Sequence, residues 1–160
     1  MLTQDRVKEL FEYKDGKLYS KVNRTRLRIG DEVGGVCPTT GYFRLRIEQK
    51  RYKRSRIIFL YHNGYMPKVV DHINGNTTDD RIENLREADF YTNQYNAKLR
   101  KDSTSGIKNV HWSKSHNKWQ VRICIDGKRK GLGYYDDLEL AALVAEEARN
   151  KYHKEFARHE

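Results

Sequence analysis

The apolar positions near the N-terminus recur at helical spacing. Val7, Leu10 and Phe11 fall on one face of a helix, and Thr3 can cap its start. The Asp15-Gly16 pair that follows is a typical hairpin turn signal. The pattern therefore predicts a short helix followed by a β-hairpin.

Residues 42–47 alternate between apolar and polar side chains. Phe43, Leu45 and Ile47 face one way, and the tyrosine and arginines between them face the other. After a turn at Gln49-Lys50, basic residues continue over 51–54. Dense arginine favours a surface that lies against DNA over a solvated strand face. The candidate DNA contacts are Arg44, Arg46, Arg51 and Arg54.

The next segments mix helical signals with polar loops. Ser55 can cap a helix that Gly64 ends. A short apolar run then leads to Asp71-His72 and a polar loop that contains glycine. Asp79 and Asp80 in this loop are more typical of helix caps than of metal ligands. A short helical piece carrying Asn84 follows.

A longer helix is predicted from near Asp89 to about Leu99. It carries Asn93 on the face of Phe90 and Ala97. Residues 100–105 are polar and short-chained, and they are followed by glycine, which predicts a linker.

A different pattern begins after the linker. Strands are predicted over 107–112, 119–125 and 132–134, with the Asp126-Gly127 turn between the last two. Trp119 lies on the apolar phase of its strand, which favours a core position. Asp136 or Asp137 then caps a long helix with an alanine-rich stripe. His62, His153 and His159 are not part of any catalytic or metal-binding motif in the sequence, and we expect them to be ordinary surface or edge residues.

These elements predict an α+β fold. A β-rich N-terminal region leads into a second segment that mixes strands and helices, and a small three-stranded antiparallel sheet backed by one helix follows. The expected divisions are a first domain over 1–99 with its core at about 54–99, a linker over 100–105 and a second domain over 106–160.

The charge points to a polyanionic partner. The chain of 160 residues has 32 Lys+Arg against 22 Asp+Glu, a formal net charge of +10. Two distant cysteines and no Cys/His cluster argue against a structural zinc and a disulfide framework. No apolar run is long enough to span a bilayer, so we expect a cytoplasmic protein without a membrane partner.

An acid, a histidine and amide oxygens suit a hard divalent cation beside a phosphate. The ordered motifs Asp71-His72, 73–76, 79–86 and Asn93 resemble the HNH nuclease family, in the form seen in phage and intron-encoded endonucleases. The resemblance implies a ββα-metal core, with Asp71 and Asn93 as ligands of one Mg²⁺ or Mn²⁺. It also implies that His72 is the general base and that Asn84 pins the loop.

One position departs from that family's pattern. Members often carry a histidine in a His-Arg-Leu-like run upstream, and here the run is Ser55-Arg56-Ile57. Because this position lies outside the proposed metal site, we expect activity to survive with altered substrate positioning.

The tail, residues 105–157, resembles the plant ethylene-response-factor (AP-two) DNA-binding domain. The resemblance rests on Ser105-Gly106, Trp112, Lys118-Trp119, Leu132-Gly133-Tyr134 and the alanine-bearing helix. It implies a sheet in the major groove of DNA, backed by the helix. The outward positions would be Lys108, His111, Gln120, Arg122 and Arg129, with Lys114 near phosphate.

The function that these features predict is that of a metal-dependent, site-specific homing endonuclease, which acts on double-stranded DNA as a monomer or homodimer. The products would carry 5′-phosphate and 3′-hydroxyl ends, and a phage-encoded protein would work in the infected host's cytoplasm. The alternative is a non-cleaving DNA-binding regulator derived from an HNH nuclease. An RNA-binding protein of the translation machinery fits the charge but not the paired motifs.

Overall fold

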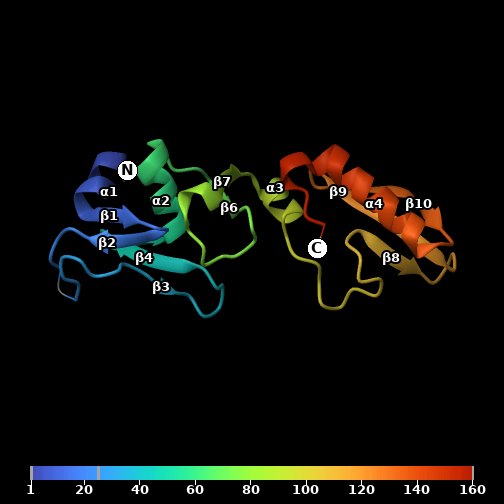
Figure 1. Cartoon of the computed structure of the whole chain (residues 1–160), viewed down its shortest axis with the longest axis horizontal. Coiled ribbons are helices and arrows are strands. Elements are labelled where there is room, and N and C mark those ends of the chain that lie inside the picture. The colour runs from blue at the N-terminus through green and yellow to red at the C-terminus, as the bar shows by residue number, and fades with distance from the viewer. Residues whose placement is uncertain (1, 25, 160) are drawn as a thin grey trace. The chain divides into compact units, whose positions relative to one another are not determined.

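The computed structural model describes residues 2–24 and 26–159. They form a mixed α/β structure of small antiparallel sheets and four α-helices, divided into two compact units (Figure 1). The units span 1–89 and 90–160. This division falls ten residues before the domain end expected at 99, so the helix that carries Asn93 belongs to the second unit.

The first unit opens with the predicted helix and hairpin. In α1 (Gln4–Leu10), the Thr3 hydroxyl accepts a hydrogen bond from the Arg6 N–H at 3.3 Å. The strands β1 (Phe11–Lys14) and β2 (Lys17–Ser20) pair antiparallel around Asp15 and Gly16. Both turn residues have positive φ, 46° and 77°, as a two-residue hairpin with the right twist requires.

A second small sheet has the order β3 (Gly35–Val36), β4 (Phe43–Ile47), β5 (Lys50–Lys53). The alternation predicted for β4 is present, since Leu45 and Ile47 are buried. The turn to β5 consists of Glu48 and Gln49, at φ 47° and 66°. It therefore begins one residue earlier than the expected Gln49-Lys50 turn.

Helix α2 (Arg54–Asn63) packs its buried side chains into the core of the first unit. Gly64 ends it in the left-handed conformation at φ 80°, as predicted. The predicted start at Ser55 was wrong: the N-cap is Lys53, and Ser55 lies inside the first turn with 2% of its surface exposed. Helices α1 and α2 contact each other. Together with β1, β2 and β4 they enclose one apolar core.

The last elements of the first unit are β6 (Val69–His72), the short 3-10 helix η1 (Ile82–Asn84) and β7 (Leu85–Ala88). Strands β6 and β7 pair antiparallel, with Asp71 opposite Arg86 and His72 opposite Leu85. A turn follows β6 at once, closed by the Gly75 N–H donating to the His72 carbonyl at 2.8 Å.

The second unit begins with α3 (Phe90–Tyr95), which is shorter than the helix predicted to reach Leu99. The predicted apolar face is wrong, because Phe90 is 66% exposed and Ala97 is exposed as well. The buried residue is Tyr95, whose ring stacks on His153 with centroids 3.8 Å apart.

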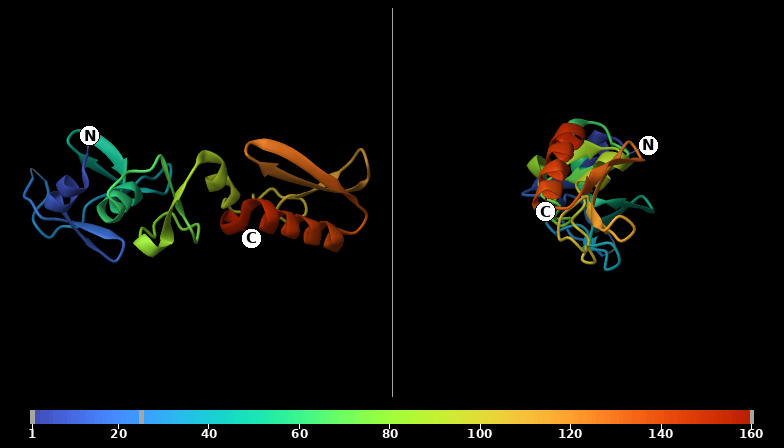
Figure 2. Two further views of the ribbon diagram at one scale, coloured as in Figure 1. Left: turned by 90° about the horizontal axis from the view of Figure 1, so that it is seen from above. Right: turned by 90° about the vertical axis from the view of Figure 1, so that its right-hand side faces the viewer.

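The rest of this unit has the predicted arrangement of three strands and a helix. Strands β8 (Val110–Ser113), β9 (Lys118–Ile125) and β10 (Lys128–Tyr135) form an antiparallel sheet with β9 in the middle. Helix α4 (Leu138–His153) lies along this sheet (Figure 2), and η2 (Lys154–Phe156) follows it. The Asp137 carboxylate caps the start of α4. Ala141 and Ala145 pack against Val110 and Val121 in a small core. No helix in the described part of the chain is long and apolar enough to cross a membrane.

Candidate functional site

The β6–β7 hairpin buries the predicted acid and the predicted base. Asp71 and His72 are 5% and 3% exposed at the end of β6. Arg86, across the hairpin, donates to the Asp71 Oδ2 atom from both Nε and Nη2 at 2.8 Å. A buried carboxylate needs such a partner, and this one also fixes its orientation.

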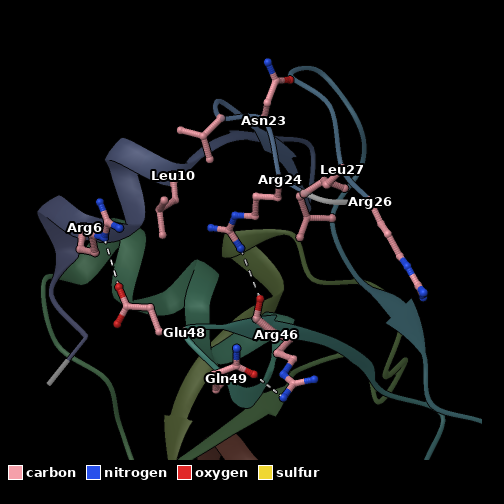
Figure 3. A pocket seen from close by; sticks show the side chains of 11 residues that line it. Arg6, Leu10, Asn23, Arg24, Arg26, Leu27, Arg46, Glu48 and Gln49 are labelled. Carbon is pink, nitrogen blue, oxygen red and sulfur yellow. Dashed lines mark hydrogen bonds and ion pairs between the residues drawn. The ribbon is translucent and has the colours of Figure 1, made fainter.

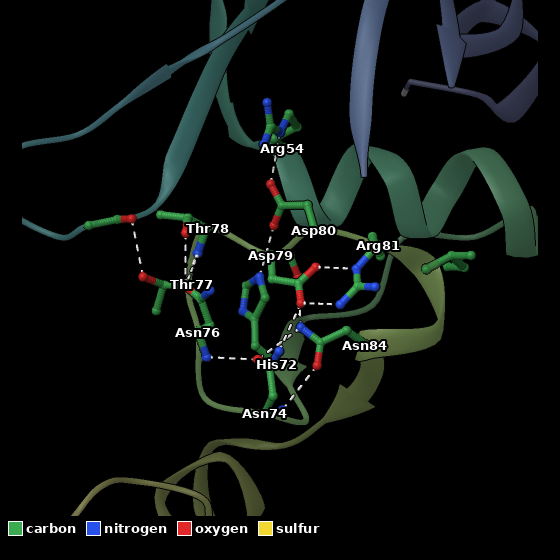
Figure 4. Close-up of polar contacts among 12 residues, drawn as sticks. Arg54, His72, Asn74, Asn76, Thr77, Thr78, Asp79, Asp80, Arg81 and Asn84 are labelled. Atoms are coloured by element: carbon green, nitrogen blue, oxygen red, sulfur yellow. Dashed lines mark hydrogen bonds and ion pairs between the residues drawn. The ribbon is translucent and has the colours of Figure 1, made fainter. Parts of the chain in front are cut away.

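His72 contacts a second carboxylate from the loop (Figure 4). Its Nε2 atom lies 2.8 Å from Asp80 Oδ1, and Asp80 Oδ2 accepts from Arg54 Nε at 2.8 Å. Arg54 and Asp80 are each 2% exposed. Sequence reasoning missed this set, since it treated Asp80 as a helix cap.

Arg54 is not a DNA contact, and that prediction was wrong. Its side chain is buried in the first turn of α2 and is bonded to Asp80 and, through Nη1, to Glu32 at 2.9 Å. The guanidinium carbon also lies 3.6 Å from the centre of the Phe43 ring. A buried arginine with two carboxylate partners cannot reach a phosphate without breaking both.

Asn84 closes the loop between the two strands. Its amide oxygen accepts from the Asn74 N–H at 3.0 Å, and its amide nitrogen donates to Asn74 Oδ1 and to the Asp79 carbonyl at 3.1 and 2.7 Å. The side chain is 6% exposed. These three bonds tie the start and the end of the loop to one side chain.

Asp79 stabilises the loop from its outer side. Hydrogen bonds from Arg81 hold the pKa of the Asp79 carboxyl well below its usual range, against the opposing effect of burial. Asn74 Nδ2 donates to the same carboxylate at 2.8 Å. Neither Asp79 nor Asp80 caps η1, whose N-cap residue is Arg81.

This hairpin lies inside a segment that matches a known family. A family model described as HNH endonuclease matches residues 52–98. Protein 3.8 of Escherichia phage T7 is 38% identical over 98 residues, which are 60% of this chain and 80% of that protein. The chain belongs to the family of this phage protein, and it contains an HNH endonuclease domain over residues 52–98. No solved structure matches it.

The HNH domain sets the class of function. An HNH domain implies a nucleic-acid substrate and a nuclease or nucleic-acid-binding role. The match includes all four residues expected to be catalytic: Asp71, His72, Asn84 and Asn93. The family model ends at 98, so the resemblance of the tail to a plant DNA-binding domain stays a prediction.

Asn93 lies on α3, in the second compact unit, and is half-buried. Asp71 and His72 lie in the first. The convergence of these three side chains on one ion stays a prediction.

Tyr42 is a neighbour of the HNH histidine that the sequence did not single out. Its ring centre lies 5.8 Å from that of His72. Burial, and then the charge of Asp71, raise the pKa of the Tyr42 hydroxyl. The Lys53 ammonium sits 3.6 Å from the Tyr42 ring centre. The alternating pattern of residues 42–47 placed Tyr42 on the outer face of the strand and gave no sign that it lies beside His72.

A basic hollow borders strand β6. Its volume is about 300 Å³, and beside Val69 and Val70 of β6 it is lined by Tyr52 and five cations, which are Arg44, Arg51, Lys53, Arg56 and Lys68. Burial, followed by the charges of Arg44 and Arg56, lowers the pKa of Lys53. Two predicted DNA contacts, Arg44 and Arg51, thus share one cationic surface.

Arg46 belongs to a different hollow in the first unit (Figure 3). This one has a volume of about 850 Å³ and is lined by Arg6, Arg24 and Arg26 as well. Arg6 is paired with Glu9 and Glu48, and Arg24 donates to the Arg46 carbonyl at 3.4 Å.

In the second unit, most predicted DNA-contacting positions are on the outer face of the sheet. His111, Arg122 and Arg129 are exposed, and Lys114 is exposed in the turn after β8. Gln120 lies opposite His111 and donates to the Tyr134 hydroxyl at 2.9 Å. Burial, then Arg122 and Arg129, lower the pKa of His111, which places three of these groups close together.

Lys108 does not fit the predicted outward role. Its ammonium donates to the carbonyls of Tyr95 and Ala97 at 2.7 and 2.6 Å. Burial, together with Arg149 and Arg158, lowers the pKa of Lys108 to about 8. The side chain therefore secures the segment after α3 and does not project from the sheet.

His153 was expected to be a surface or edge residue but is buried, with 4% of its surface exposed. Its Nε2 atom lies 2.8 Å from the Cys124 carbonyl, and its Nδ1 atom has no hydrogen-bond partner among the described residues. Burial is the main cause that lowers the pKa of this imidazole. Its stacking on Tyr95 makes it a core residue of the second unit.

Proposed function

We propose that this chain is a metal-dependent, site-specific DNA endonuclease of the homing type. One observation carries the proposal: the HNH match covers a hairpin that holds a buried Asp71-His72 pair beside a loop clamped by Asn84. A histidine held at one end by a carboxylate has the proton-accepting chemistry that phosphodiester hydrolysis requires.

In the proposed reaction, His72 takes a proton from a water molecule. The water oxygen forms a bond to phosphorus as the bond from phosphorus to the 3′ oxygen breaks. The leaving 3′ oxygen takes a proton from solvent water, so the products carry a 5′-phosphate and a 3′-hydroxyl. General-base catalysis of this kind accelerates reactions by about 10²–10⁴-fold.

The available donors fit Mg²⁺ or Mn²⁺. The Asp71 carboxylate and the Asn93 amide are hard oxygen ligands. The described residues contain no group of three or more His, Cys, Asp or Glu side chains able to hold a metal. Such a sparse set suits an ion that keeps several waters. When bound, the ion would neutralise charge on the scissile phosphate and on the leaving oxygen.

The DNA backbone would lie over the basic hollow beside β6. Arg44 and Arg51 line it with three further cations, and no acidic side chain is among the described residues that form the lining. Lysine and arginine contacts to phosphate position a duplex without reading its sequence.

The second unit would add sequence preference. Arg122, Arg129 and Gln120 lie on the outer face of its sheet, and arginine and glutamine can read base edges in the major groove. Because this unit is covalently joined to the first unit, its binding raises the effective concentration of DNA at the β6–β7 hairpin.

One observation favours the alternative of a non-cleaving regulator. The candidate metal ligand Asp71 is already paired with Arg86, which neutralises part of the charge a cation would need. Under that alternative, the hairpin binds DNA without cutting it.

Cleavage of supercoiled plasmid or phage DNA separates the two functions. The endonuclease should convert the plasmid to nicked or linear forms with Mg²⁺ or Mn²⁺ and leave it intact with EDTA. His72→Ala should lower the cleavage rate by about 10²-fold or more, with DNA affinity within about twofold of the wild type.

Two outcomes would contradict the proposal. Normal binding with no cleavage under either ion would support the regulator. Equal loss of binding and cleavage in His72→Ala would show that His72 holds DNA or the fold and does not act as the base. Mapping the cut ends on the source genome would then give the target sequence, and sedimentation would distinguish a nicking monomer from a dimer.

A further inference from the structure

A line of polar contacts leads from the surface of the first unit to the catalytic histidine. Lys17 bonds Glu32 at 2.9 Å, and Glu32 accepts from Arg54 at 2.9 Å. Arg54 then bonds Asp80, which contacts His72, both at 2.8 Å (Figure 4). The last three side chains are 2–3% exposed, so water does not compete for their hydrogen bonds.

The chemistry of this line fixes the position of one proton. An ionised carboxylate only accepts hydrogen bonds, and an arginine only donates them. Since Arg54 keeps its charge and donates to Asp80 Oδ2, Asp80 is held as a carboxylate whose Oδ1 faces His72. The His72 Nε2 atom must therefore carry a proton, and in a neutral ring the lone pair belongs to Nδ1.

We propose that Asp80 and Arg54 are positioning residues that hold His72 in the Nε2–H tautomer, so that Nδ1 receives the proton of the attacking water. The catalytic half of this proposal rests on the proposed nuclease function. The tautomer half is a property of the folded chain and holds with or without cleavage.

Replacing Asp80 by asparagine tests the assignment because the change is nearly isosteric. The amide has one acceptor side and one donor side. Arg54 donates, so the amide oxygen must face Arg54 and the NH₂ group must face His72. The Nε2 atom then has to accept, and the ring proton moves to Nδ1. The variant should therefore hold the ring in place with the wrong tautomer.

Nitrogen-15 NMR of the imidazole rings at alkaline pH reads the tautomer directly. The signals of His72 are assigned by their loss in His72→Gln. The wild type should show Nε2 protonated, and Asp80→Asn should show Nδ1 protonated. Asp79→Asn removes a neighbouring carboxylate that bonds Arg81, so it should leave the His72 signals in place.

Single-turnover cleavage gives the catalytic readout. Asp80→Asn should slow cleavage by about 10²-fold or more, as expected when a general base has its lone pair on the wrong nitrogen. DNA affinity should stay near the wild-type value. The melting temperature should fall, because Arg54 loses the charge of a buried partner, so both cleavage rates are measured at a temperature where each protein is folded.

The double variant Arg54→Met with Asp80→Asn isolates the role of the arginine. Without the donor, the amide can turn its oxygen toward His72, and the Nε2–H signal should return. Cleavage should recover at least about tenfold over Asp80→Asn alone, which is the partial rescue expected for tautomer control.

Each arm can overturn the proposal. A wild-type ring with its proton on Nδ1 would refute the tautomer assignment without any variant having to fold. An Asp80→Asn enzyme that changes tautomer but cuts at the wild-type rate would refute the catalytic role. A wild type that cuts no DNA, yet shows the expected tautomers, would reject the nuclease and keep the positioning network.

Discussion

At the scale of single residues, two buried histidines differ because their partners differ. His72 faces the carboxylate of Asp80, while His153 faces a backbone carbonyl and a tyrosine ring. A carboxylate partner suits a histidine that must handle protons. A carbonyl and an aromatic ring suit one that serves packing, because burial among Tyr95, Lys108 and Arg149 disfavours its cationic form.

The pKa of His153 predicts acid sensitivity of the second unit. Its folded pKa is lowered, whereas the unfolded histidine titrates near about 6.5. The unfolded state therefore binds the proton more readily, and the unit should lose stability as pH falls below about 6.5 toward the folded pKa. In His153→Gln, the difference between melting temperatures at pH 7.5 and pH 5.5 should be smaller than in the wild type.

Tryptophan fluorescence is the suitable probe, because Trp112 and Trp119 both lie in the second unit. His116→Gln, at an exposed position of the same unit, is the matched control and should follow the wild type at both pH values. An unchanged pH dependence in His153→Gln would show that other groups cause the acid sensitivity.

At the scale of elements, the first unit braces the loop between β6 and β7 from two sides. Asn84 bonds both ends of the loop, and the β1–β2 hairpin lies against its far end. The Tyr13 hydroxyl accepts from the Ile82 N–H at 3.1 Å. A side chain at Gly16, in the turn, would come within 2.7 Å of the Arg81 nitrogen. The hairpin thus needs glycine both for its positive φ and for this close approach.

Asn84→Ala should destabilise the first unit by about 2 kcal/mol, because it removes all three hydrogen bonds of a buried side chain that holds the two ends of the loop together. Urea denaturation followed by far-ultraviolet circular dichroism measures this change. The transition of tryptophan fluorescence, which belongs to the second unit, should not move.

Asn76→Ala serves as the comparison. Its exposed side chain bonds only Thr78 within the described part of the chain, so the cost should be well under that of Asn84→Ala. Equal costs for the two variants would mean that the loop does not depend on Asn84.

At the scale of the whole molecule, each unit carries its own cationic surface. The first unit has the hollow lined by Arg44 and Arg51, and the second unit has the outer sheet face with Arg122 and Arg129. Phosphate contacts release counterions, so binding should weaken steeply as salt rises.

Arg122→Gln with Arg129→Gln should lower the slope of log affinity against log salt by about 0.9 for each phosphate that the protein no longer neutralises. Lys151→Gln with Lys154→Gln removes the same two charges from the end of α4 and η2 and should change the slope far less. Fluorescence anisotropy with labelled duplex at several salt concentrations supplies both slopes. Equal slopes in the two double variants would show that only net charge matters.

Much of the local structure followed from the sequence, because its causes are local. Apolar periodicity predicted α1, β4, the sheet of the second unit and α4. The Asp15-Gly16 and Asp126-Gly127 pairs predicted turns, since both adopt the positive φ values that such turns need. The spacing of Asp71, His72, Asn84 and Asn93 was enough to identify the HNH family.

Tertiary structure alone decided which polar side chains meet. Arg54 and Asp80 are 26 residues apart, and Glu32 is 22 residues from Arg54, so no local pattern could indicate their contacts. Arg54 looked like one more surface arginine, Ser55 like a cap and His153 like an edge residue. All three side chains are buried, which reverses these assignments. Whether a polar or charged side chain can be buried depends on partners that other elements supply, and these do not show in the local sequence.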